Sequence, residues 1–99
     1  MRENMDYILE SIGEAAAYEQ LAEECTELAK AALKKARILR GDNPTPVLGY
    51  EADRMVREEF TDVMDCADIL GLATDYSQRT TKIERWISRI NEAKNRKEN

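Results

Sequence analysis

Apolar residues recur at helical spacing along two long segments of this chain, 14–39 and 51–73. In both segments the spacing is three or four residues, which places the apolar side chains along one side of an α-helix. The pattern predicts two long amphipathic helices, each of which needs an apolar partner. The apolar positions are Leu21, Cys25, Leu28, Ala32, Ala36 and Leu39 in the first segment, and Ala52, Val56, Phe60, Val63, Ala67 and Leu70 in the second.

The segment between these helices cannot continue either of them. Gly41 is expected to end the first helix, and residues 42–46 contain two prolines, which have no amide hydrogen to donate. A loop is therefore predicted up to Gly49. With the apolar stripes facing each other, the two helices would pack antiparallel, and Phe60, in the middle of its stripe, would lie in the core.

Two shorter helices complete the prediction. One spans Glu3–Glu10, before a break at residues 11–13, and the other begins at Ser77 as N-cap and runs to Ala93, with fraying from Lys94 onward. The sequence thus predicts an all-α fold, a small antiparallel bundle of about four helices, in one domain covering residues 1–99. A domain of this size buries only about 60–70% of its unfolded surface, so association into an oligomer is expected.

Charge is distributed unevenly along the chain. The net charge is -5, yet residues 1–75 hold 17 of the 20 acidic residues, whereas residues 79–97 hold seven of the 15 basic ones. A net negative protein is a poor binder of nucleic acid, which requires an excess of Lys and Arg. No apolar run approaches the roughly 20 residues that span a bilayer, and no signal-peptide core is present, so a cytoplasmic protein without membrane attachment is predicted. Both cysteines are expected to be reduced.

An eight-residue acidic pattern occurs twice, 35 residues apart, at 21–28 and 56–63. Residues three apart on a helix share a face, so Glu24 pairs with Glu27, and Glu59 with Asp62. Each pair lies on the same flank of its apolar stripe, and antiparallel packing would bring the four carboxylates together. Four converging carboxylates repel one another unless a cation neutralises them.

The donor set favours a hard cation, Mg²⁺ with Mn²⁺ as a substitute, because carboxylate oxygens are the ligands that these ions prefer. The chain contains no histidine, which argues against Glu-x-x-His di-iron sites and most zinc sites. One residue in five is acidic, so an ordinary solvated acidic face is the competing interpretation. The residues alone leave both interpretations open.

The two motifs together resemble the signature of the MazG-like, all-α nucleoside triphosphate pyrophosphohydrolases, in which a Glu-Glu-x-x-Glu helix faces a Glu-x-x-Asp helix. Gly13, Gln20 and the segment 62–70 add to the resemblance, which covers about residues 12–75. It implies Mg²⁺-dependent hydrolysis of a nucleoside or deoxynucleoside triphosphate to the monophosphate and pyrophosphate, by in-line attack of water. It also implies a homodimer or homotetramer and a role in cleansing the nucleotide pool.

The resemblance implies a role for each acidic residue of the motifs. Glu24, Glu27, Glu59 and Asp62 would be the metal ligands, and Glu23 would lie beside the site, orienting ligands or activating the attacking water. On the C-terminal segment, Lys82, Arg85 and Arg89 recur at helical spacing and could contact substrate phosphates. A solvated basic face is the alternative for these three residues.

Two further functions are compatible with the same sequence. The chain could be a catalytically degenerate helical oligomer that binds nucleotide or a protein partner. It could also be a purely structural coiled-coil adaptor, whose stability would not respond to metal.

Overall fold

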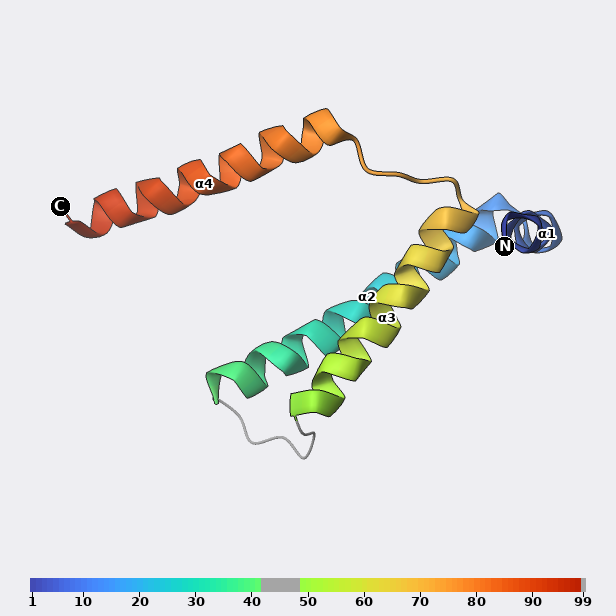
Figure 1. The fold of residues 1–99 in the computed structure, drawn as a ribbon, viewed down its shortest axis with the longest axis horizontal. Coiled ribbons are helices and arrows are strands. Elements are labelled where there is room, and N and C mark those ends of the chain that lie inside the picture. Colours follow the sequence, from blue (N-terminus) through green and yellow to red (C-terminus); the bar gives the residue numbers. More distant parts are fainter. Residues whose placement is uncertain (42–48, 99) are drawn as a thin grey trace.

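The computed structural model describes residues 1–41 and 49–98, which form four α-helices (Figure 1). These are α1 (Arg2–Ile12), α2 (Glu14–Arg40), α3 (Gly49–Ile69) and α4 (Tyr76–Glu98). No β-strand occurs in this part of the chain, so the predicted all-α class is confirmed. Among the described helices, none is both long enough and apolar enough to cross a bilayer.

Helices α2 and α3 lie side by side and run antiparallel, as the sequence predicts (Figure 1). Near the C-terminal end of α2, Lys35 Nζ lies 2.9 Å from Asp53 Oδ1 of α3. Near the other end, Gln20 of α2 and Cys66 of α3 line one cavity of about 60 Å³. The positions of these residue pairs at opposite ends show the antiparallel register of the two helices.

Three alanines form the buried core of the described chain: Ala17, Ala31 and Ala52, which are 3%, 5% and 1% exposed. Their small side chains let α2 and α3 approach closely. The expectation that Phe60 lies in the core is wrong, because its side chain is 52% exposed. Cys25, another predicted stripe residue, is exposed as well. The apolar stripes are wider than the contact between the helices, so each stripe is only partly covered.

Enlarging a buried alanine should therefore destabilise the chain. We expect Ala52→Leu to lower the free energy of unfolding by about 1–3 kcal/mol, because the added methyl groups force α2 and α3 apart. Ala22→Leu is the matched control, since Ala22 is exposed on α2. Urea unfolding followed by circular dichroism measures both variants, and equal midpoints for the two would contradict this account of the core.

Both predicted ends of α2 are observed, although α1 begins at Arg2 and continues to Ile12, beyond the predicted Glu3–Glu10. Gly13, between α1 and α2, has φ 88°, and Gly41 ends α2 with φ 69°, a left-handed conformation that suits glycine. The Gly41 amide donates to the Arg37 carbonyl at 3.0 Å. The loop predicted for residues 42–46 lies outside the described residues. Helix α1 is tied to the end of α3 by Arg2, whose Nη1 donates to the Asp68 carbonyl at 3.0 Å.

The boundaries of the last two helices differ from the prediction. Helix α3 ends at Ile69 rather than at residue 73, because Gly71 adopts φ 71° and the Leu72 amide turns back to the Ala67 carbonyl at 2.9 Å. The N-cap of α4 is Asp75 rather than Ser77, since Asp75 Oδ1 accepts from the Gln78 amide at 2.9 Å. The fraying predicted from residue 94 is not observed, as α4 continues to Glu98.

Helix α4 stands apart from the other three (Figure 1). In the described part of the chain it makes no contact with α1, α2 or α3, which pack on one another. The radius of gyration is accordingly 18.1 Å, compared with about 13 Å for a globular domain of this length. The four predicted helices are confirmed in the part of the chain that the structure describes, but only α1, α2 and α3 pack together.

Candidate metal centre

Three of the four predicted ligands meet between α2 and α3. Carboxylate oxygens of Glu24 on α2, and of Glu59 and Asp62 on α3, all lie within 4.8 Å of one another. Glu59 and Asp62 share a face because they are three residues apart, and the antiparallel register sets Glu24 opposite them. We call these three residues the carboxylate cluster. Glu24 and Glu59 are half-buried, whereas Asp62 is exposed.

Glu27, the fourth predicted ligand, lies outside the carboxylate cluster. Its Oε1 atom is 3.4 Å from Lys30 Nζ, in an ion pair whose side chains are 52% and 70% exposed. An exposed pair of this kind contributes only about 0–1 kcal/mol, so little opposes its opening. Glu27 is one helical turn from Glu24, and its role as a ligand stays a prediction.

The electrostatics of the cluster disfavour a full set of negative charges. The pKa of Glu59 is raised above its usual value of 4.5, first by the loss of solvent around the carboxylate and then by repulsion from Asp62, Glu24, Glu27 and Glu58. A divalent cation among these oxygens would remove the repulsion and favour the ionised form of Glu59. The site thus has the charge pattern of a cation-binding site.

Gln20 positions one of the predicted ligands, a contact that the motif pattern did not indicate. Its Nε2 atom donates to Glu24 Oε1 at 2.8 Å, which holds the Glu24 carboxylate in place. The signal was available in the sequence, since Gln and Glu four residues apart on a helix are within hydrogen-bonding distance. The exposed pair has a single hydrogen bond, so its effect is on orientation rather than on overall stability.

The repeated threonines have a structural role. Thr26 Oγ1 donates to the Ala22 carbonyl at 3.1 Å, and Thr61 Oγ1 donates to the Arg57 carbonyl at 2.8 Å. Each hydroxyl thus bonds to the carbonyl four residues earlier in its own helix. These hydrogen bonds account for the identical threonines of the two acidic motifs within their own helices.

The cysteines near the cluster do not change its oxygen donor set. The pKa of the Cys66 thiol is raised, first by burial and then by the negative charges of Glu24, Asp62 and Asp65. Because metals bind the thiolate rather than the thiol, this environment disfavours sulfur ligation. Cys25 and Cys66 are both free, which agrees with the expected reduced state. The remaining donors are carboxylates, which fit Mg²⁺ and Mn²⁺.

Glu23 and Glu58 occupy equivalent places in the two acidic motifs, and both are exposed. Neither belongs to the carboxylate cluster. The role of Glu23 in orienting ligands or activating water stays a prediction.

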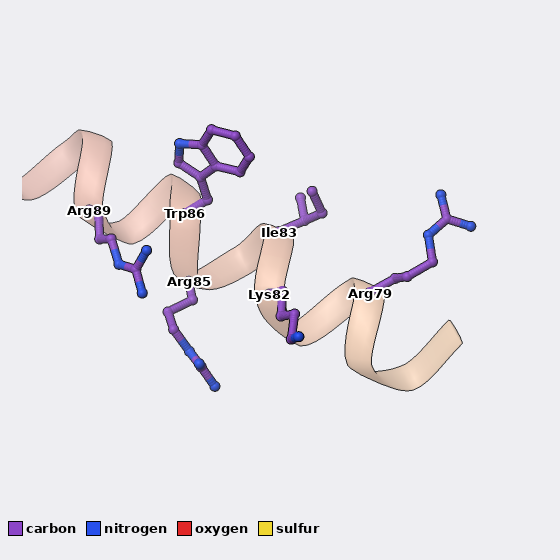
Figure 2. Close-up of a pocket in the computed structure, with 6 residues that line it drawn as sticks. All are labelled: Arg79, Lys82, Ile83, Arg85, Trp86 and Arg89. Atoms are coloured by element: carbon purple, nitrogen blue, oxygen red, sulfur yellow. The ribbon is translucent and has the colours of Figure 1, made fainter. Parts of the chain in front are cut away.

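The basic residues of α4 are separate from the carboxylate cluster, because α4 does not pack on the helices that carry the cluster. Lys82, Arg85 and Arg89 extend to one side of α4, and Ile83 and Trp86 extend to the other (Figure 2). With Arg79 they line an open hollow of about 490 Å³ on this single helix. Because α4 does not contact the other helices, the structure does not bring these three side chains to the carboxylates within one chain.

Comparison with known proteins does not identify a family for this chain. No protein-family model, curated protein or solved structure matches this chain.

Proposed function

We propose that the protein is a Mg²⁺-dependent pyrophosphohydrolase of nucleoside or deoxynucleoside triphosphates. The observation that carries the proposal is the convergence of Glu24, Glu59 and Asp62 from two antiparallel helices. An all-carboxylate set on rigid helices holds a hard cation while leaving positions open for phosphate oxygens. The resemblance of the two acidic motifs to the MazG-like enzymes supports the same reaction and a role in cleansing the nucleotide pool.

Each acidic residue has a place in this proposal. Glu24, Glu59 and Asp62 would hold the ion, which neutralises charge on the substrate's phosphate oxygens when bound. Glu27 would join them by releasing Lys30. Glu23, on the same helix as Glu24, would orient the ligands or help to activate the attacking water by accepting its proton. A carboxylate is the available general base, because the chain has no histidine.

Substrate phosphates also need positive charge, and Lys82, Arg85 and Arg89 are the proposed source. Guanidinium groups bind phosphate oxygens through paired hydrogen bonds. Since α4 lies away from the carboxylate cluster in one chain, it must move or belong to another copy to act there. The proposal therefore includes a homodimer or homotetramer as the working form.

A panel of nucleoside triphosphates tests the reaction. Purified protein with Mg²⁺ should release pyrophosphate and the monophosphate from at least one ribo- or deoxyribonucleoside triphosphate. Mn²⁺ should support the reaction, and a chelator should stop it. Release of inorganic phosphate instead of pyrophosphate would place the cleavage at a different bond and contradict the proposal.

The second candidate is a helical oligomer that binds nucleotide or a protein partner without turnover. The separation of the α4 basic residues from the carboxylate cluster favours it, because catalysis needs both groups at one substrate. Calorimetric titration with a non-hydrolysable triphosphate and Mg²⁺ distinguishes the two candidates. Binding by a protein that releases no pyrophosphate from any substrate would favour this second function.

A further inference from the structure

Helix α4 carries an apolar stripe that no other described helix of the same chain covers. Ile83, Trp86, Ile87 and Ile90 are spaced by three and four residues, so they share one side of the helix. Their side chains are 54%, 63%, 52% and 45% exposed. Most helices in proteins are stabilised by packing an apolar side on a neighbour rather than by intrinsic helix propensity. The α4 stripe therefore requires a partner.

Within residues 1–41 and 49–98, the α2–α3 pair also leaves an apolar side uncovered. Phe60 and Met64, one turn apart on α3, are 52% and 42% exposed, and Leu39 and Tyr18 of α2 are 73% and 46% exposed. On α3, Phe60 and Asp62 lie on opposite flanks of Glu59, because each residue turns by about 100°. The apolar side of α2–α3 thus faces away from the carboxylate cluster, and a partner could cover it without blocking the metal site.

Charge indicates which partner fits α4. The segment 76–98 holds seven basic and three acidic residues, whereas 1–75 holds eight basic and 17 acidic ones. Pairing two α4 helices would bring net positive segments together. An anionic membrane would attract α4 but repel the acidic remainder of the chain. The acidic α1–α3 body of a second copy attracts α4 and also offers the uncovered apolar side.

We propose that α4 of one copy packs its apolar stripe on the apolar side of α2–α3 in a second copy, and that the second copy does the same in return. The result is a dimer with two equivalent contacts. Each contact covers a surface that is otherwise exposed on both partners. The proposal concerns assembly and does not depend on the catalytic function.

The sole tryptophan of the chain, Trp86, reports the contact directly. In the full chain, sedimentation should show a dimer, and dilution should shift Trp86 emission to longer wavelength as the dimer dissociates. Ile87→Asp should raise the dimer dissociation constant at least 100-fold. Ser88→Asp, which places the same charge on the neighbouring exposed position, should leave dissociation unchanged. Ile90→Gln is a milder second variant if Ile87→Asp loses helicity.

Mixing two defective variants tests the exchange between copies. Phe60→Asp should weaken the dimer as Ile87→Asp does, because it alters the receiving surface. A heterodimer of Phe60→Asp with Ile87→Asp has one contact that is unaltered on both sides, so the mixture should form dimers at concentrations where each variant alone is monomeric.

Five results would overturn the proposal. A monomer with shielded Trp86 at every concentration would mean that α4 packs on its own chain. A dimer insensitive to Phe60→Asp, or equally sensitive to Ser88→Asp, would mean that another surface pairs. A mixture that does not dimerise would exclude the exchange, and binding of α4 to anionic phospholipid vesicles in place of dimer formation would indicate a membrane.

Discussion

Asp62→Asn should reduce Mg²⁺-dependent pyrophosphate release by about 10²–10³-fold, the loss typical of removing one charge-stabilising group from an active site. The neutral amide keeps the shape of the side chain but removes the negative charge that would balance the charge of the cation. Glu24→Gln should have an effect of similar size, because Glu24 is the proposed ligand from the opposite helix, where its carboxylate meets those of Glu59 and Asp62. Initial rates at saturating Mg²⁺ measure both variants.

Asp65→Asn is the control for Asp62→Asn, since Asp65 is an exposed aspartate one turn further along α3 and outside the carboxylate cluster. It should keep the rate within a few-fold of the unmodified protein. Circular dichroism should show the same helicity for every variant. If release persists in both Asp62→Asn and Glu24→Gln, the carboxylate cluster is not the active site.

Glu59→Gln should stabilise the metal-free protein above the acidic range and remove its response to Mg²⁺. The pKa of Glu59 is raised in the folded state, so the folded protein holds this proton more tightly than the unfolded chain does. The free energy of unfolding therefore falls as the pH rises from the pKa of Glu59 in the unfolded chain through its pKa in the folded protein. At neutral pH the full destabilisation by the ionised Glu59 carboxylate is present. A neutral glutamine carries no such penalty.

Thermal unfolding with a chelator and with Mg²⁺ measures this effect. Mg²⁺ at about 100 times its dissociation constant should stabilise the unmodified protein by about 2.7 kcal/mol, or roughly 10–20 °C for a chain of this size. Glu59→Gln should show a much smaller shift, whereas Glu58→Gln, a neighbouring charge change outside the carboxylate cluster, should keep it. Equal shifts in all three proteins would contradict metal binding at Glu59.

The parts of the structure set by local interactions were predictable from the sequence. Periodicity located α2 and α3, and Gly13 and Gly41 marked the ends of α2 because their backbones adopt conformations that suit glycine. Helical phase also predicted that Glu24 would meet the acids of α3. These features depend on residues within one or two turns, or on the register of one helix pair.

The features that the sequence did not predict depend on contacts between distant residues or on competing bonds. Phe60 belongs to a stripe that is wider than the helix contact, and only the packing geometry shows which part of it is covered. Glu27 forms an ion pair with Lys30 rather than joining the carboxylate cluster. Both partners are within reach of its side chain, and helical spacing does not show which one it contacts. The separation of α4 is not encoded in its periodicity, because an amphipathic pattern does not identify its partner.

If the carboxylate cluster holds Mg²⁺ as proposed, the close approach of α2 and α3 has a consequence for ion selectivity. Ala31 and Ala52, at the contact between the helices, do not touch a cation, yet their size sets the spacing of the two backbones that carry the carboxylates. Mg²⁺ requires oxygens at about 2.0–2.1 Å in a nearly octahedral shell, whereas Ca²⁺ accepts 2.3–2.6 Å and more ligands. Larger side chains at these two positions would widen the cage and shift its preference toward Ca²⁺, without any change to a ligand.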